Sequence, residues 1–373
     1  MIGHSGGNVY AVIMAGGIGK NFWPLSRKKV PKQFIDLFDE GTMIGKTVDR
    51  IKATVAEANI LIITTPQGRE KLAGTLEHFP QGNIIVEPGI RNTAPCIALA
   101  TAYIKKRDDD AITVVLPSDH LVDDDDTFNQ IVREGITLAA EKKGLVTIGI
   151  KPDRPETDYG YIQADEQYPL PHPFSDGNDF KLYKVRAFAE KPDYATAEQF
   201  LESRDFFWNS GVFIWHIDAI AREFERSMPE LYKDMLHIYD NLGTENERKV
   251  IEDVYSWLHP ISIDYGIMEK AEIVFVLTGE FGWTDLGNWD EVLKVAAERL
   301  SFNGRHQDKQ LVKIECENVY VKKSAGKVVC AIGLNDIIII DTDDALLVCG
   351  KGYSHLVGGI VDTLRREGME EYL

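Results

Sequence analysis

The stretch VYAVIMAGGIG (residues 9–19) decides the fold. Its first seven residues are apolar throughout, which is typical of a parallel-sheet strand that is covered on both faces. Gly16, Gly17 and Gly19 follow at once and predict a turn whose backbone N–H groups can approach a phosphate closely. The dinucleotide-binding fingerprint does not fit, because Phe22 stands where its third glycine is needed. The turn alone therefore leaves two interpretations open, a phosphate loop and a tight turn without a ligand.

Five basic residues lie within the thirteen positions from Lys20 to Lys32. The chain as a whole has a formal net charge of −18, so a local cluster of cations suits an anionic ligand such as a triphosphate or pyrophosphate. Lys32 stands in the motif PKQF and is the candidate for a positioned cation. We expect Lys28 and Lys29 to be solvated, and the role of Arg27 stays undecided.

Outward from this stretch, the first half of the chain alternates β-rich runs with helical patterns. This rhythm predicts a mostly parallel sheet with helices on both faces, in which ligands bind at the carboxyl ends of the strands. The glycine turn and the turns EPGIRNT and PSDH all fall at such ends. The middle of the chain is expected to continue the same domain and to cover this rim. The expected strands are 58–65, 83–88, 111–119 and 145–150, and the expected helices are 42–55, 68–79, 94–106 and 127–143.

After residue 303 the pattern changes to four short strands that start at nine-residue intervals, at residues 318, 327, 336 and 345. Turn residues separate them, which predicts a small all-β module, either a meander or short coils of a β-helix. A helical pattern over 360–372 closes the chain. We therefore predict two domains, 8–302 and 303–373.

Length and composition agree with this division and restrict the function. A chain of 373 residues is longer than one compact core usually holds. The net charge argues against general binding of nucleic acid or of an anionic membrane, and we expect no membrane span. The four cysteines form no CxxC pair and are expected to be reduced thiols in a cytoplasmic protein.

Two carboxylates are candidates for binding a hard cation such as Mg²⁺. Asp119 ends a buried strand, and Asp285 lies in GWTDLGNWD between aromatic residues and glycines. Mg²⁺ typically uses one or two protein carboxylates and takes its other ligands from phosphates and water. Taken singly, each aspartate is better explained as a cap or turn residue, and His120 is expected to be a structural hydrogen-bonding residue.

Polar residues among aromatic residues suggest a sugar site. The stretch FFWNSGVFIW (206–215) sets Asn209 and Ser210 among phenylalanines and tryptophans. The stretch FAEKP offers Glu190, whose carboxylate can accept hydrogen bonds from sugar hydroxyls, and Lys191, whose ammonium can hold a phosphate. The residues VFIW at the end of the first stretch are expected to be core strand.

Together these stretches resemble the sugar-phosphate nucleotidyltransferases, and within them the mannose-1-phosphate guanylyltransferases. The resemblance runs from about Asn8 to the end of the chain. It is carried, in chain order, by AGGIGKNFWPLSRKKVPKQF, EPGIRNTAPCIALA, PSDH, YGYIQ, FAEKPD, WNSGVFIW, SIDYGIMEK and GWTDLGNWD.

The resemblance implies a Rossmann-like three-layer αβα domain, followed by a small left-handed β-helix domain used for homodimer contacts. The implied reaction joins GTP and mannose 1-phosphate into GDP-mannose and pyrophosphate, with Mg²⁺. The implied site residues fall into three groups: Lys32, Asp119 and Asp285, with Lys20 beside them, at the reacting phosphates and the metal; Gly16, Gly17, Gly19, Arg91, Asn92, Thr93, Pro95 and Ser118 at the nucleotide; Gly160, Glu190, Lys191, Asn209 and Asp264 at the sugar phosphate.

The chain departs from the family pattern where Lys20 and Asn21 replace threonine and arginine. Asparagine cannot supply the charge or the planar fork of that arginine, although a lysine one position earlier could reach the same oxygens. A milder change is Asp158, where the family often has glycine. Three hypotheses therefore stay open: an active guanylyltransferase, a non-catalytic or weakly active paralogue that binds nucleotide sugars, and the same chemistry on another sugar 1-phosphate.

Overall fold

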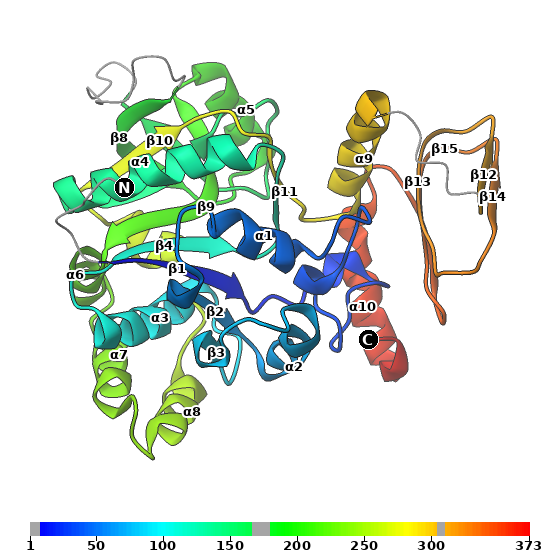
Figure 1. Cartoon of the computed structure of the whole chain (residues 1–373). Helices are drawn as coiled ribbons and strands as arrows, with labels where there is room; N and C mark the ends of the chain where they lie inside the picture. The colour runs from blue at the N-terminus through cyan, green and yellow to red at the C-terminus, as the bar shows by residue number, and fades with distance from the viewer. Residues whose placement is uncertain (1–7, 166–179, 304–309) are drawn as a thin grey trace.

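The computed structural model describes residues 8–165, 180–303 and 310–373 (Figure 1). The seven residues at the amino terminus, which the fold prediction set aside, lie outside the described part. In the described part of the chain, no helix combines the length and the apolar character that crossing a membrane requires.

The centre of the molecule is one nine-stranded sheet with the order β3-β2-β1-β4-β9-β6-β10-β8-β7. Most strands run in one direction, as predicted, while β8 and β9 run against their neighbours. The strands are β1 (Val9–Ala15), β2 (Ile60–Thr64), β3 (Ile84–Val86), β4 (Ile112–Pro117), β6 (Leu145–Ile150), β7 (Tyr161–Ala164), β8 (Lys181–Ala189), β9 (Phe206–His216) and β10 (Val274–Thr278).

Helices cover both faces of this sheet, so the predicted three-layer arrangement is confirmed. Alternate residues of β1 point to opposite sides: Tyr10 and Val12 pack in one core cluster with helices α3, α6, α7 and α8, whereas Ala11 and Ile13 pack in another with α1, α2 and α4. The helices are α1 (Met43–Ile51), α2 (Pro66–Thr75), α3 (Thr93–Arg107), α4 (Asp125–Lys142), α5 (Tyr194–Ser203), α6 (Ile217–Ser227), α7 (Pro229–Asn241), α8 (Glu247–Trp257), α9 (Trp289–Asn303) and α10 (Val357–Arg366).

The middle of the chain does more than cover the rim of the sheet, and here the prediction was incomplete. Strand β9 inserts between β4 and β6, and β7, β8 and β10 extend the sheet beyond them. The residues expected to be core strand, Val212–Trp215, lie on β9 and are buried. Two short strands, β5 (His120–Val122) and β11 (Trp283–Asp285), pair outside the main sheet and bring Asp285 opposite His120.

The carboxyl-terminal module has the pairing of β-helix coils and not that of a meander. Two parallel pairs each join residues 18 positions apart, such as Leu311 with Val329 and Glu317 with Asn335. Only the last pair, β15 with β16, is antiparallel. The strands are β12 (Leu311–Ile314), β13 (Glu317–Lys322), β14 (Val329–Ile332), β15 (Asn335–Asp341) and β16 (Leu346–Gly350), and β12 was not predicted.

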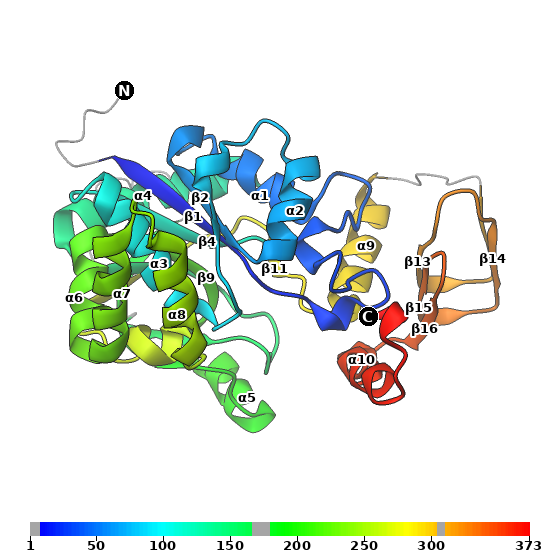
Figure 2. The same cartoon turned by 90° about the horizontal axis from the view of Figure 1, so that it is seen from below.

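This module and α10 pack against the segment that follows the glycine turn (Figures 1 and 2). The indole N–H of Trp23 donates to the carbonyl of Tyr372 at 2.9 Å. Arg27, whose role the sequence left undecided, donates two hydrogen bonds of 2.6 Å to the carboxylate of Asp344. Lys28 is exposed, as expected. The segment after the glycine turn therefore has a structural role, because it holds the carboxyl-terminal module. This role is separate from any role in binding a ligand.

Candidate active site

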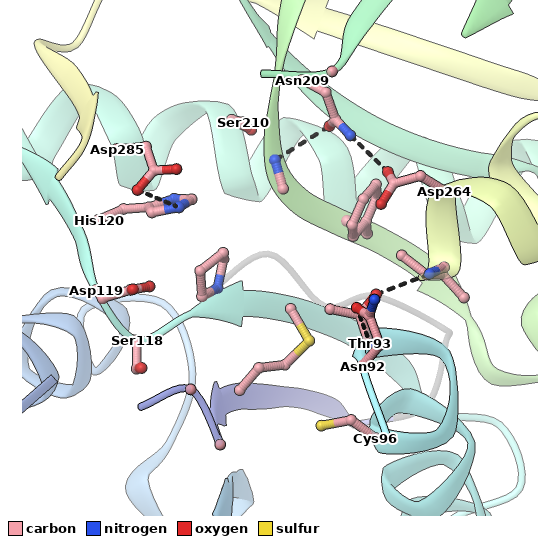
Figure 3. Close-up of a pocket in the computed structure, with 18 of the residues that line it drawn as sticks. Asn92, Thr93, Cys96, Ser118, Asp119, His120, Asn209, Ser210, Asp264 and Asp285 are labelled. Carbon is pink, nitrogen blue, oxygen red and sulfur yellow. Dashed lines mark hydrogen bonds and ion pairs between the residues drawn. The ribbon is translucent and has the colours of Figure 1, made fainter. Parts of the chain in front are cut away.

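A cavity of about 580 Å³ opens at the carboxyl ends of β1 and β4. Because β9 is antiparallel to β4, its first half also reaches this end of the sheet and carries Asn209 and Ser210 into the cavity wall. Figure 3 shows how side chains from these separate elements face the same space. Of the site residues predicted from the sequence, the wall contains Gly16, Gly17, Asn92, Thr93, Ser118, Asp119, Gly160, Glu190, Lys191, Asn209, Asp264 and Asp285.

The other five predicted residues are not part of the cavity wall, and one of them, Lys20, points away from it, so its predicted place at the reacting phosphates was wrong. Lys32 contacts two wall carboxylates from behind, and Gly19 packs directly on its side chain. Arg91 donates from Nε to the carbonyl of Tyr255 at 3.1 Å, and Pro95 is buried in α3. Lys20 points to α10, where its ammonium lies 3.5 Å from a carboxylate oxygen of Asp362.

A buried ammonium joins the two predicted metal carboxylates. Lys32 is only 6% exposed, and its Nζ lies 2.8 Å from Asp119 Oδ2 and 3.7 Å from Asp285 Oδ1. Burial alone would lower the pKa of Lys32, but the two carboxylates outweigh it and hold that pKa above its ordinary value. Burial opposes the ionisation of Asp119 too, yet Lys32 holds the pKa of this carboxyl below its usual range. Lys32 and Asp119 are therefore both charged at neutral pH.

Gly19 makes this approach of Lys32 possible. Its φ of 73° lies in the left-handed region, which favours glycine. A Cβ on Gly19 would also lie 2.3 Å from the Cβ of Lys32, closer than two carbon atoms can pack. Among the predicted glycines, Gly19 thus positions the cation, while Gly16 and Gly17 form part of the wall.

His120 is a neutral, structural residue, as expected. Burial lowers the pKa of its imidazole. The indole N–H of Trp283 donates to His120 Nδ1 at 3.2 Å, which leaves the proton of the neutral ring on Nε2. That nitrogen faces Asp285 Oδ1 at 3.9 Å, which is too far for a direct hydrogen bond (Figure 3).

The two carboxylates suit a magnesium ion that is bound together with phosphates. No group of three or more histidine, cysteine, aspartate or glutamate side chains is arranged to hold a metal among the residues described. Mg²⁺ does not need such a group, because phosphate oxygens and water complete its octahedron. Asp119 and Asp285 supply the one or two protein carboxylates that this mode of binding requires.

The opposite side of the cavity is polar and partly protonated. Asn209 Nδ2 donates to Asp264 Oδ1 at 2.8 Å (Figure 3). Burial, reinforced by the charge of Glu190, raises the pKa of Asp264 to about 7. A Cβ on Gly160 would lie 2.7 Å from a carboxylate oxygen of Glu190, so a side chain at this position would displace that carboxylate. Lys191 follows at the wall with an exposed side chain.

Sequence reasoning missed several residues of the cavity wall. Glu87 is 3% exposed, accepts a hydrogen bond of 2.8 Å from the hydroxyl of Tyr255, and has a pKa that burial raises to about 7. It ends a buried strand within EPGIRNT, which is the signal that selected Asp119, so the same argument could have found it. Tyr159 and Trp283 also belong to the wall. Both lie inside quoted motifs, YGYIQ and GWTDLGNWD, in which only the glycine and the aspartate were chosen as site residues.

Comparison with known proteins gives two family models that together match most of the chain. The model described as "Nucleotidyl transferase" matches residues 10–301. The model described as "MannoseP isomerase/GMP-like beta-helix domain" matches residues 309–364. The second match agrees with the coil pairing of the carboxyl-terminal strands.

Individual relatives match over nearly the whole chain. A curated mannose-1-phosphate guanylyltransferase of Escherichia coli is 34% identical over 366 residues, which is 97% of this chain and 76% of the relative. The xanthan biosynthesis protein XanB of Xanthomonas campestris is 32% identical, over 98% of this chain and 75% of the relative. Among solved structures, one described as a mannose-1-phosphate geranyltransferase of Thermus thermophilus has a TM-score of 0.82 and 30% identity, and the match covers 96% of this chain and 100% of the other.

Proposed function

Since the chain belongs to the nucleotidyltransferase family, together with the curated mannose-1-phosphate guanylyltransferases, we propose that it transfers GMP from GTP to mannose 1-phosphate. The products are GDP-mannose and pyrophosphate. One observation carries the proposal: the buried ammonium of Lys32 contacts the half-buried carboxylates of Asp119 and Asp285 beside a glycine turn, at the wall of a cavity whose other side is polar.

In the proposed reaction, a phosphate oxygen of mannose 1-phosphate attacks the α-phosphorus of GTP in line with the leaving pyrophosphate. The new P–O bond forms as the bond between the α-phosphorus and the bridging oxygen breaks, so no covalent enzyme intermediate is needed. The backbone N–H groups at Gly16 and Gly17 approach the triphosphate, and Lys32 neutralises charge on the reacting phosphates. Members of this family generally use a divalent cation. We propose Mg²⁺, which would neutralise phosphate charge when held by Asp119 and Asp285.

The sugar end is supported by the hydrogen-bonding groups opposite this cluster. Asn209, Glu190 and Asp264 offer amide donors and carboxyl oxygens that match the hydroxyls of a hexose. Lys191 is the proposed cation for the sugar phosphate. Because the pKa of Asp264 is about 7, this carboxyl can donate as well as accept a hydrogen bond near neutral pH.

We assign the base end to the turn that contains Asn92 and Thr93 and add Glu87 to it. A carboxylate only accepts hydrogen bonds, and guanine presents two neighbouring donors, N1–H and the 2-amino group. Adenine presents an acceptor in place of the first donor. An ionised Glu87 would therefore favour guanine over adenine, and bound guanine would in turn favour the ionised form of this carboxyl.

Two further proposals concern the assembly and its location. Apolar side chains are exposed on the β-helix module, with Val328, Ile332, Leu346 and Val348 each 58–66% exposed. This supports a homodimer through the module, since contiguous exposed apolar surface often marks a protein interface. The proposed substrates imply a cytoplasmic location, and the division into domains 8–302 and 303–373 remains a proposal.

The test is pyrophosphate release from GTP, ATP, UTP and dTTP, each with mannose 1-phosphate and Mg²⁺. We expect turnover with GTP well above the other nucleotides, and loss of turnover in Asp119→Asn. A panel of other hexose and heptose 1-phosphates checks the alternative that the chain acts on another sugar. Much higher turnover with another sugar 1-phosphate than with mannose 1-phosphate would reject mannose as the substrate.

The other alternative is a paralogue that binds GDP-mannose without turning substrates over. Asn21 in place of arginine is the observation that favours it. Binding of GDP-mannose with no pyrophosphate release at high enzyme concentration would support this alternative and reject catalysis. If Asn21→Arg then leaves that inactivity unchanged, the asparagine is not its cause.

A further inference from the structure

Lys20 and Asn21, which replace the expected threonine and arginine, lie against the carboxyl-terminal helix α10. A Cβ on Gly358 of this helix would lie 2.8 Å from Asn21 Oδ1 and 3.2 Å from Lys20 Cε. The ammonium of Lys20 forms a solvent-exposed pair with Asp362, one turn further along α10. A glycine in the helix thus allows the short loop to approach it closely.

The oxygen of the Asn21 amide lies next to Gly358 of α10, and its nitrogen reaches the turn that follows Asp285. Asn21 Nδ2 donates to the carbonyl of Gly287 at 3.3 Å. The backbone N–H of Gly287 donates in turn to the carbonyl of Asp285 at 2.8 Å. Asn288, the next residue, accepts the first free N–H groups of α9 with its side chain. Two successive hydrogen bonds therefore connect the glycine loop to the backbone of Asp285.

The position of this backbone matters because Asp285 must converge with Asp119. The two carboxylates meet the same ammonium of Lys32 at distances of 3.7 Å and 2.8 Å. Asp119 lies in the turn directly after β4, whereas Asp285 ends the three-residue strand β11, which pairs only with the equally short β5 among the described strands. Site geometry has to be held to within about 0.5 Å, and short strands alone hold it poorly. The hydrogen bond from Asn21 anchors the turn after Asp285 in addition to the bond of 3.2 Å that the hydroxyl of Tyr159 donates to the carbonyl of Asp285.

We propose that Asn21 is a positioning residue, which holds the turn after Asp285 against the glycine loop. In this proposal, Asn21 is not merely the loss of an arginine that binds phosphate. Its side chain binds a carbonyl of the protein and not the triphosphate. The effect on turnover rests on the proposed function, but the hydrogen bond itself does not. An uncharged amide suits this place, since its partner is a carbonyl and Gly358 leaves little room on the other side.

The first experiment measures backbone hydrogen exchange in the substrate-free protein. In Asn21→Ala we expect the amides of Gly287 and Asn288 to exchange roughly threefold to tenfold faster, which corresponds to the net loss of one hydrogen bond. The matched control is Asn241→Ala, which removes another amide-to-carbonyl bond, in α7, and should leave the 283–288 segment unchanged. Unchanged exchange at Gly287 and Asn288 in Asn21→Ala would overturn the proposal.

The second experiment separates positioning from direct phosphate binding. For Asn21→Ala we expect kcat to fall roughly threefold to tenfold while KM for GTP stays near that of the wild type. Asn21→Asp keeps the shape but lacks the donor, so it should behave like Asn21→Ala. A rise in KM for GTP with unchanged kcat would instead mean that Asn21 binds the triphosphate. If the wild type releases no pyrophosphate with any nucleotide, the proposed function is rejected. The hydrogen-exchange experiment alone then tests whether Asn21 holds the turn after Asp285.

Discussion

Lys32 is the residue on which the charges of the cavity wall converge. If this lysine were replaced by an uncharged residue, the carboxylates of Asp119 and Asp285 would lose the cation between them. Two like charges so close to each other disfavour each other's ionisation. The proposed phosphate contact would be lost as well.

For Lys32→Met we expect kcat/KM for pyrophosphate release to fall about 100- to 1,000-fold, the usual cost of removing one stabilising group from a dry site. The control is Lys28→Met, which removes an exposed lysine of the same basic cluster and should retain activity. Comparable activity in the two variants would reject the role of Lys32.

Asp264 is the residue that should give the protein a pH-dependent stability. Its pKa is about 7 in the folded protein and 3.8 as the ordinary value, so between these limits the folded state binds more protons than the unfolded state. The free energy of unfolding therefore falls as pH rises from about 4 to 7, by at most about 4 kcal/mol from this group.

In Asp264→Asn, the side-chain amide can still accept the hydrogen bond from Asn209, but it has no ionisable carboxyl group. We expect a flatter dependence of the free energy of unfolding on pH over this window, with the variant relatively more stable at pH 8 than at pH 4. Denaturant unfolding at a series of pH values measures it. Parallel curves for the variant and the wild type would contradict the raised pKa.

At the scale of elements, the glycine turn after β1 has two kinds of glycine. Gly19 has a positive φ and touches Lys32, whereas Gly17 has nothing within 4 Å of where a Cβ would stand. We expect Gly19→Ala to lower the free energy of unfolding by about 1–3 kcal/mol, because the backbone is strained and Lys32 must move. It should also lower turnover.

Gly17→Ala is the matched control, since it adds the same methyl group two residues away. Its free energy of unfolding should stay within about 0.5 kcal/mol of the wild type. Equal destabilisation by both substitutions, measured in denaturant, would show that the turn tolerates no side chain at all and that the contact with Lys32 is not the reason.

Some strands could be predicted from the sequence and others could not. Strands such as β2 and β6 could be predicted because a buried parallel strand is apolar without interruption. Strand β12 could not, because its residues Leu311–Ile314 are mostly exposed and leave no apolar run. The position of β9 between β4 and β6 could not be predicted either, since the local sequence of a strand does not determine which strands it pairs with.

At the scale of the whole molecule, one apolar cluster joins the β-helix module to the first part of the chain. Phe22, Trp23 and Trp289 share it with Ile338 and Ile340. A shared core of this kind couples the stability of the two parts, because neither can expose its side of the cluster without losing burial.

Ile340→Ala should therefore lower the stability of the entire chain in a single transition, by about 2–5 kcal/mol. Ile314→Ala is the matched control: that side chain is 50% exposed in the same module, so its truncation should change stability little. Calorimetry measures both. Two separate transitions, of which only one responds to Ile340→Ala, would show that the parts unfold independently.

The sequence by itself determined the alternation of strands and helices in the first half of the chain, the three loops at one rim, and twelve residues of the cavity wall. These follow from local causes: apolar runs form buried strands, strands end at turns, and parallel strands present their carboxyl ends to one edge. The tertiary structure alone decided which strands pair, that the module after residue 303 is coiled, and that Arg27 and Lys20 face the carboxyl-terminal part. It also gave Asn21 its partner. Contacts between residues hundreds of positions apart depend on how whole elements pack, and a local pattern carries no record of that.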